Sequence, residues 1–83
     1  MYSVLINRDA LKYIDVLTEK SKRLIKRKLE TLKDDPYLGR DDKKKLQFTD
    51  YELFRMHVGR SYTIFYRIYE EEKTVKVLDI MTI

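Results

Sequence analysis

The segment Leu53–Ile68, LFRMHVGRSYTIFYRI, decides the fold because apolar and polar residues alternate on both sides of its Gly-Arg-Ser break. Alternation with a period of two is typical of strands that bury one face, and a short break containing glycine is typical of a hairpin loop. The segment therefore predicts two antiparallel strands. It also contains the single histidine of the chain, His57, and three arginines, so the residues that define the fold are also candidates for function.

Two pairing registers are open to this hairpin. A two-residue turn at 59–60 would place Val58 opposite Ser61 and would mix apolar with polar partners. A three-residue loop over 59–61 places Val58 opposite Tyr62 and keeps one face apolar along its length. Because a slip of one residue moves every side chain to the other face, we predict the three-residue loop. The apolar pairs are then Val58–Tyr62, Met56–Ile64 and Phe54–Tyr66.

The same register predicts the composition of the opposite face. Cations alternate there with aromatic rings, an arrangement that suits phosphate contacts and base stacking. Polar residues on the solvent face of an antiparallel sheet are also expected without any function. The face would carry Arg55 opposite Phe65, His57 opposite Thr63, Leu53 opposite Arg67 and Tyr51 opposite Tyr69, with Arg60 in the adjoining loop.

The N-terminal part of the chain predicts one strand and two helices. Residues 2–7 contain two β-branched residues and suit a strand. Asp9 is the predicted N-cap of a first helix, and Ser21 is the predicted start of a second. The second helix should end at residues 34–35, because the residue before Pro36 disfavours helical geometry.

The rest of the chain completes an α+β fold. Residues 36–50 are predicted as a polar connector, followed by strands near 51–58, 62–69 and 74–82. The order β-α-α-β-β-β predicts a helical hairpin packed on one face of a mostly antiparallel four-stranded sheet. With 83 residues, we expect a single domain spanning 1–83.

Composition excludes several classes of protein. There is no cysteine and one histidine, so we expect no disulfide framework, no metal site of the usual thiolate or imidazole type and no cofactor. No apolar run reaches the roughly 18 residues of a membrane span, and we expect an intracellular protein with no membrane partner. The net charge of +4 is compatible with an anionic partner.

Other charged groups admit two interpretations. Six basic residues between Lys20 and Lys28 could follow a phosphate backbone, or could form the solvated face of an amphipathic helix. Lys43–Lys45 lie closer to the proposed face than this run does. The preceding residues Asp41 and Asp42 weaken the positive field of these lysines. Asp79 interrupts an apolar strand and should have a partner, such as an arginine.

An ordered series of motifs resembles the RelE/ParE superfamily, the toxins of type II toxin–antitoxin pairs. The series is KKL at 44–46, FRMHVGRSYTIFYRI at 54–68 and VKVLDI at 75–80. The resemblance covers essentially the whole chain. It implies a small fold whose concave face enters the ribosomal A site, where RelE-type members cut mRNA without metal, whereas ParE-type members poison DNA gyrase. It also implies a cognate antitoxin as partner, besides the ribosome and mRNA.

Residue by residue, the resemblance carries over in part. Arg55 and His57 occupy the two basic positions of the family's second strand, which makes them the candidate catalytic residues. Thr63 stands where an arginine is usual, and Thr82 and Ile83 stand where a terminal His-Arg would be. The candidate RNA-binding residues are Lys44, Lys45, Arg60, Phe65 and Arg67.

These matches and losses favour three functions. The first is a RelE-like toxin, a metal-free endoribonuclease that cleaves mRNA on the ribosome, with Arg55 binding phosphate and His57 as acid or base. The second is a catalytically degenerate RelE-fold binding module that only engages its antitoxin. The third is a DNA gyrase inhibitor of the ParE type.

Overall fold

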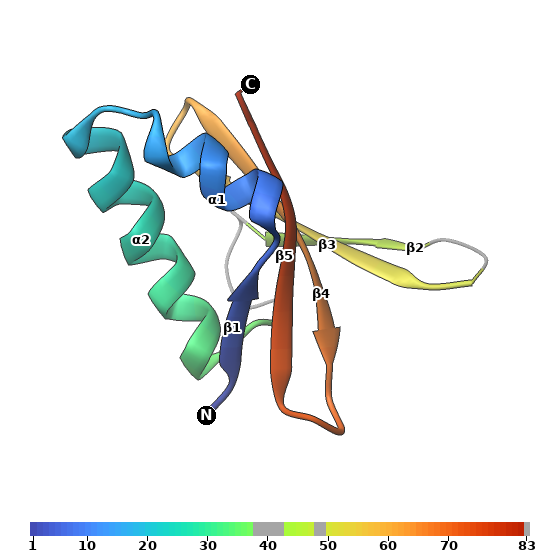
Figure 1. Ribbon diagram of the computed structural model, residues 1–83. Helices are drawn as coiled ribbons and strands as arrows, with labels where there is room; N and C mark the ends of the chain where they lie inside the picture. The colour runs from blue at the N-terminus through green and yellow to red at the C-terminus, as the bar shows by residue number, and fades with distance from the viewer. Residues whose placement is uncertain (38–42, 48–49, 83) are drawn as a thin grey trace.

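In the computed structural model, which describes residues 1–37, 43–47 and 50–82, both helices cover one face of a five-stranded sheet (Figure 1). The strand order is β1-β5-β4-β3-β2, with β1 parallel to β5 and the other pairs antiparallel. The α+β prediction is therefore confirmed. The elements are β1 (Ser3–Ile6), α1 (Arg8–Asp15), α2 (Glu19–Asp34), β2 (Lys43–Gln47), β3 (Glu52–Val58), β4 (Tyr62–Tyr69) and β5 (Thr74–Thr82).

The sheet has one strand more than the four predicted. Residues 43–47 lie in the predicted polar connector, yet they form β2 and pair with β3 from Lys43–Met56 to Gln47–Glu52. The sequence KKKLQ has no apolar alternation, because an edge strand needs only backbone pairing with one neighbour. Lysines at an edge also discourage pairing with other chains. The remainder of the connector, 38–42 and 48–49, lies outside the described residues.

Both helices begin earlier than predicted. The side chain of Asn7 accepts a hydrogen bond from the Asp9 backbone N–H at 2.7 Å and caps α1, and Thr18 accepts one from Ser21 at 3.3 Å and caps α2. Asp9 and Ser21 are thus inside the first turns, where polar residues also occur. The predicted end of α2 is confirmed, since the helix stops at Asp34.

The predicted register of the central hairpin is confirmed. Val58 pairs with Tyr62 and Phe54 with Tyr66 across a loop at 59–61, and the residues between them pair as expected. Gly59 has φ of 59°, a left-handed conformation that favours glycine. Every second side chain of β3 is buried against the helices.

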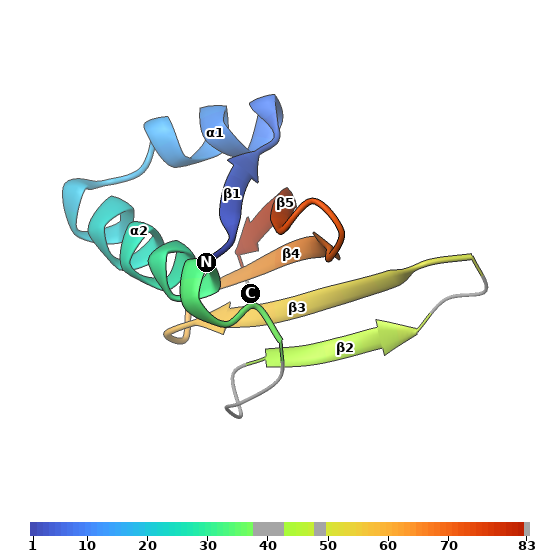
Figure 2. The same cartoon turned by 90° about the horizontal axis from the view of Figure 1, so that it is seen from below.

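The hairpin pairing ends earlier than predicted. The predicted cross-strand pairs Leu53–Arg67 and Tyr51–Tyr69 do not form, because the β3–β4 register stops at Phe54–Tyr66. Figure 2 shows β2 and β3 continuing together beyond β4. The ring of Tyr37 packs edge-on against Phe54, with centroids 5.9 Å apart, at the place where the strands separate.

A β-bulge in β5 explains Asp79. The register passes from Phe65–Asp79 to Tyr66–Val77, so Leu78 has no partner. The extra residue reverses the alternation and turns Asp79 away from the helices while Ile80 and Val77 stay buried. The predicted arginine partner is wrong: Asp79 accepts a hydrogen bond from the Ile80 N–H at 2.9 Å and makes no ion pair within the described part of the chain.

Tyrosine hydroxyls connect the sheet to the helical layer. The buried Tyr66 hydroxyl donates to the Pro36 carbonyl at 2.8 Å, and the Tyr62 hydroxyl donates to Ser21 Oγ at 2.9 Å. These bonds satisfy polar groups that burial would otherwise penalise. No helix in the described ranges is long and apolar enough to cross a membrane.

Glu70, in the β4–β5 turn, binds two tyrosines from segments that are distant in sequence. Its carboxylate accepts hydrogen bonds from Tyr2, at 2.6 Å, and from Tyr37, and it pairs with Lys73. The bonds from Lys73 and the two tyrosines lower the pKa of Glu70 from 4.5 to about 2. The same carboxylate raises the pKa of the Tyr37 hydroxyl.

The lowered pKa of Glu70 predicts a pH dependence of stability. A group with a depressed folded-state pKa contributes above its unfolded pKa, near 4.5, and loses that contribution as the pH falls to about 2. Glu70→Gln should therefore be less stable than the unchanged chain at pH 7, and the difference should close between those two values. Urea unfolding over a pH series measures it. The exposed neighbour Glu71 is the control, and a difference for Glu70→Gln that does not depend on pH would contradict the prediction.

Candidate functional site

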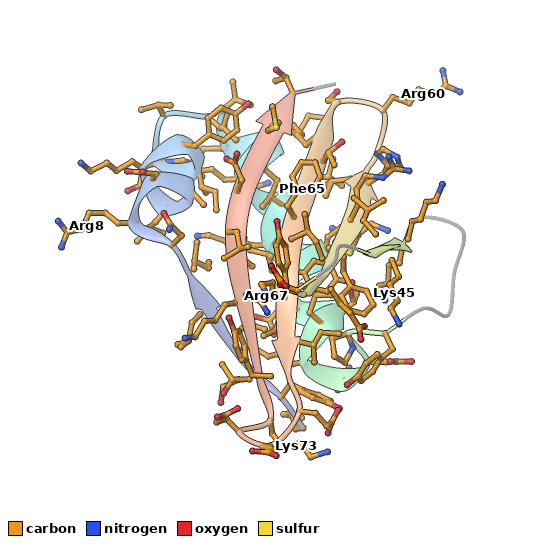
Figure 3. All side chains as sticks on the ribbon, turned by 90° about the vertical axis from the view of Figure 1, so that its right-hand side faces the viewer. Arg8, Lys45, Arg60, Phe65, Arg67 and Lys73 are labelled. Carbon is orange, nitrogen blue, oxygen red and sulfur yellow. The ribbon has the colours of Figure 1, made fainter. Side chains whose placement is uncertain are left out.

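The side of the sheet opposite the helices, called the open face below, carries the candidate site (Figure 3). On β3 it consists of the residues that alternate with the buried ones, and on β4 of every second residue from Thr63 to Tyr69, of which Thr63 is itself buried. The register of β2 and β5 extends it on both sides, because directly opposite residues share a face. Its members are Lys44, Leu53, Arg55, His57, Thr63, Phe65, Arg67, Tyr69, Lys76, Asp79 and Met81.

His57 lies half-buried near the loop end of β3. Its Nδ1 is 3.2 Å from Oγ1 of Thr63, the residue directly opposite on β4. One ring nitrogen is therefore engaged with the protein, and Nε2 is the other nitrogen through which the ring can act on a ligand. Histidine is the side chain whose ordinary pKa allows it to accept and donate protons near neutral pH.

Arg55 lies two residues before His57 on the same face. Its Nε is buried and, among the described residues, is the one buried side-chain nitrogen or oxygen that lacks a hydrogen-bond partner. Buried polar atoms are almost always paired, so an unpaired one calls for a specific explanation. A guanidinium with spare donors favours a phosphate or carboxylate as ligand. Lys44, across from Arg55 on β2, adds a second cation.

Phe65 occupies the centre of the open face. It is directly opposite Arg55 on one side and Asp79 on the other, and it is partly exposed. A flat apolar ring beside a guanidinium provides a surface on which a nucleobase can stack while its phosphate contacts the cation. Arg55, His57 and Phe65 thus form one continuous patch.

Arg67 is held by aromatic rings. Its guanidinium lies 4.9 Å from the ring centroid of Tyr51 and 5.3 Å from that of Tyr69, and Lys76 lies 4.8 Å from Tyr69. Such cation–π contacts fix the position of the charge while leaving its edge donors able to bind. The sequence contained the signal, since Tyr51 and Tyr69 were expected on this face, but it did not show that both rings contact Arg67.

Two of the predicted RNA-binding residues do not lie on the open face itself. Arg60 projects from the loop beside the open face (Figure 3). Lys45 pairs with Phe54 in the register and therefore lies on the other side of β2, where its Nζ is 2.9 Å from Glu52. Alternation along β2 therefore places Lys45 on the opposite side of the strand from Lys44, and its part in binding RNA stays a prediction.

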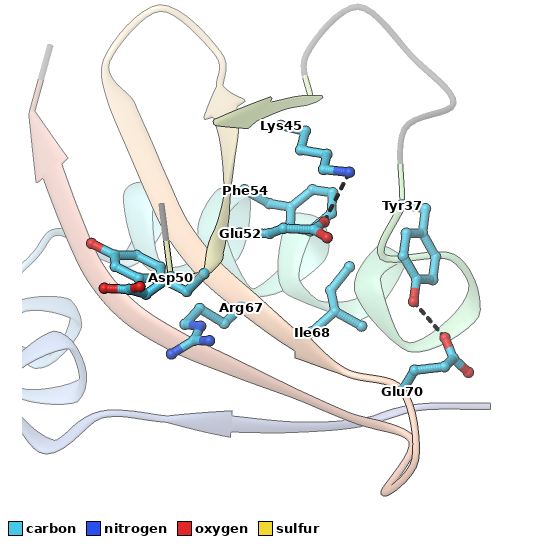
Figure 4. A pocket seen from close by; sticks show the side chains of 9 residues that line it. Tyr37, Lys45, Asp50, Glu52, Phe54, Arg67, Ile68 and Glu70 are labelled. Atoms are coloured by element: carbon cyan, nitrogen blue, oxygen red, sulfur yellow. Dashed lines mark hydrogen bonds and ion pairs between the residues drawn. The ribbon is translucent and has the colours of Figure 1, made fainter. Parts of the chain in front are cut away.

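A cleft of about 640 Å³ lies where β3 and β4 diverge (Figure 4). Tyr37, Glu52 and Glu70 line it together with Lys45 and Arg67. Two of its carboxylates are already engaged, Glu52 by Lys45 and Glu70 by Tyr37. Neither Arg55 nor His57 lines it, so the candidate site is the open face and not this cleft.

The basic run of α2 forms a separate surface. Lys20, Arg23 and Arg27 line a hollow of about 280 Å³ around Leu24. Leu24 packs near Gly59, so this surface adjoins the hairpin loop. Its charges are on the helix and do not join the open face. The described ranges contain no cluster of three His, Cys, Asp or Glu side chains that could hold a metal.

Comparison with known proteins defines the family. The sequence model for the ParE toxin of the type II toxin–antitoxin system parDE matches residues 2–82. The chain therefore belongs to this family, and so to the RelE/ParE superfamily of toxins. No curated protein matches the sequence.

Solved structures of toxins share the fold. An archaeal RelE–RelB complex from Pyrococcus horikoshii OT3 aligns with a TM-score of 0.83 and 25% identity, covering 98% of this chain and 93% of the other. The toxin–antitoxin complex RelBE2 from Mycobacterium tuberculosis aligns with a TM-score of 0.81 and 22% identity, covering 99% and 98%. The YoeB/ParE toxin from Agrobacterium tumefaciens aligns with a TM-score of 0.78 and 10% identity, covering 98% of each chain.

Proposed function

We propose that this toxin is a RelE-like endoribonuclease that cleaves mRNA on the ribosome. The observation that carries the proposal is the patch of the open face in which His57, Arg55 and Phe65 adjoin. It combines a group for proton transfer, a cation with unused donors and a ring for base stacking. Cleavage of RNA without a metal needs proton transfer and stabilisation of the charge on phosphorus, and the ring would hold a base beside them.

The proposed reaction is internal transesterification of RNA. The ribose 2′-oxygen attacks the adjacent phosphorus and the bond from phosphorus to the 5′-oxygen breaks, leaving a 2′,3′-cyclic phosphate and a free 5′-hydroxyl. His57 Nε2 takes the proton of the 2′-hydroxyl and returns it to the departing 5′-oxygen. Arg55 binds the phosphate oxygens, whose negative charge grows in the transition state.

Neighbouring residues would position the RNA. Phe65 stacks on a base next to the scissile phosphate, and Lys44 and Arg67 contact the backbone on either side of it. Arg60 reaches RNA from the loop. The surface of α2 lies beyond that loop and offers further cations to ribosomal RNA.

The proposed partner in the cell is an antitoxin. The similar toxins from P. horikoshii and M. tuberculosis were solved in complexes with an antitoxin. An acidic segment covering Arg55 and His57 would exclude RNA from the open face. We place both proteins in the cytoplasm, where ribosomes are.

A gyrase inhibitor is the second candidate, and the match to the ParE toxin family favours it. Two parallel assays separate the candidates: mapping of mRNA ends on stalled ribosomes, and supercoiling by purified gyrase. Cuts phased with codons support the nuclease. Inhibited supercoiling with intact mRNA supports the gyrase inhibitor, and the absence of both effects supports a noncatalytic module that only binds its antitoxin.

A further inference from the structure

Thr63 is a polar residue that is buried in β4. Only 7% of it is exposed, and it is the one buried polar residue among those described. The residues on either side of it along β4, Tyr62 and Ile64, are core residues. A valine would fill the same space, so the hydroxyl is the feature that needs an explanation.

The hydroxyl of Thr63 has one side-chain partner in the described part of the chain. That partner is His57, with 3.2 Å between Oγ1 and Nδ1. The two residues are directly opposite in the β3–β4 register, and on its other side Thr63 faces Met81. The register therefore brings the two side chains together, and Nδ1 is the ring nitrogen in contact with the hydroxyl.

We infer that Thr63 is a positioning residue that accepts a hydrogen bond from Nδ1–H of His57 and so presents an unprotonated Nε2 to the open face. This inference rests on the proposed function for its catalytic meaning. In neutral histidine, one ring nitrogen carries the proton and the other carries a lone pair. The hydrogen bond made by one nitrogen decides which form is present.

The hydrogen bond from Nδ1 to Thr63 is compatible with both proton transfers of the proposed reaction. When Nδ1 donates to Thr63, Nε2 has the lone pair needed to take the 2′-hydroxyl proton. The resulting imidazolium keeps its Nδ1–H on Thr63, and Nε2–H then protonates the departing oxygen. If Thr63 instead donated to Nδ1, Nε2 would already carry a proton and could not act as the base.

The hydroxyl of Thr63 is neutral, so it orients His57 without adding charge to the open face. In the strand register, the charged residues of the open face nearest to His57 are Arg55 on its own strand, Lys44 opposite Arg55 on β2, and Asp79 opposite Phe65 on β5. Asp79 is opposite Phe65, and its carboxylate bonds the backbone of Ile80. A carboxylate at position 63 would orient the ring equally well, but it would repel the RNA phosphates.

The test compares Thr63→Val with Thr63→Ser by nitrogen NMR of the His57 ring in the folded protein. Valine keeps the shape and removes the hydroxyl, whereas serine keeps the hydroxyl. We expect the fraction of the Nδ1–H tautomer to fall in Thr63→Val and to be retained in Thr63→Ser. Equal tautomer fractions in the unchanged chain and Thr63→Val would overturn the inference. Thr63→Ala provides the same comparison if the valine variant does not fold.

Cleavage kinetics test the catalytic part. Thr63→Val should lower kcat by about 10-fold, less than the loss of about 100- to 10,000-fold expected when acid–base catalysis is removed altogether. The KM for ribosome-bound mRNA should be unchanged. A packing role alone would leave the tautomer unchanged. If the unchanged chain cuts no mRNA, the proposed function fails, while the NMR comparison still decides whether Thr63 orients His57.

Discussion

Replacing His57 with alanine is expected to lower the rate of mRNA cleavage by about 100-fold or more, because general acid–base catalysis contributes about 100- to 10,000-fold. The side chain lies on the open face and takes no part in the apolar core, so the variant should fold. The measurement is the rate at which codon-phased ends appear in ribosome-bound mRNA. His57→Gln keeps polarity without proton transfer at neutral pH and should be as slow as His57→Ala.

Arg55→Ala belongs to the same experiment and is expected to cost about 100- to 1,000-fold, the usual effect of removing one preorganised donor from developing charge. Arg55→Lys keeps the charge but loses the planar arrangement of donors, and should recover only part of the rate.

Arg8→Ala is the matched control for charge. Arg8 is exposed on α1 and points away from the sheet (Figure 3), so its loss removes the same charge from a different surface. We expect its cleavage rate to equal that of the unchanged chain. Equal losses in Arg8→Ala and Arg55→Ala would show that net charge, and not the open face, determines activity. Full cleavage activity in His57→Ala would contradict the proposed mechanism.

The sequence predicted the central hairpin well because burial depends there on strict alternation. Phe54, Met56 and Val58 could only be buried together, and that requirement excluded the other register. The placement of Arg55 and His57 on one face followed from the same alternation. Their roles in chemistry remain predictions.

Features set by the pairing of one strand with another, and not by periodicity within a strand, were not predictable in this way. The fifth strand, β2, is a lysine-rich edge whose pairing depends on β3, and no periodicity marks it. The bulge at Leu78 shifts the alternation of β5 and turns Asp79 outward, although VKVLDI alone is compatible with either face. The two rings that contact Arg67 belong to Tyr69 of β4 and to Tyr51, the residue before β3. We predicted that these two tyrosines lie opposite each other in the hairpin, and the register does not extend to them.

Truncation of two adjacent residues of β4 should have different effects, and this contrast tests the whole arrangement. Ile64 is fully buried, whereas Phe65 is partly exposed on the open face. Ile64→Ala is expected to lower the free energy of unfolding by about 2–5 kcal/mol through lost burial and a cavity, and Ile64→Val by about 0.5–1.5 kcal/mol. Chemical denaturation measures both variants.

Phe65→Ala should destabilise the fold less than Ile64→Ala, because its ring is already partly in water. It should weaken binding of single-stranded RNA by about 1–3 kcal/mol, the usual contribution of one base–aromatic stack. Fluorescence anisotropy with a labelled oligonucleotide measures this affinity, and Ile64→Val is the control that should bind as the unchanged chain does. If Phe65→Ala proved the less stable variant and bound RNA normally, the open face would be part of the core, and the surface proposed to bind RNA would not exist.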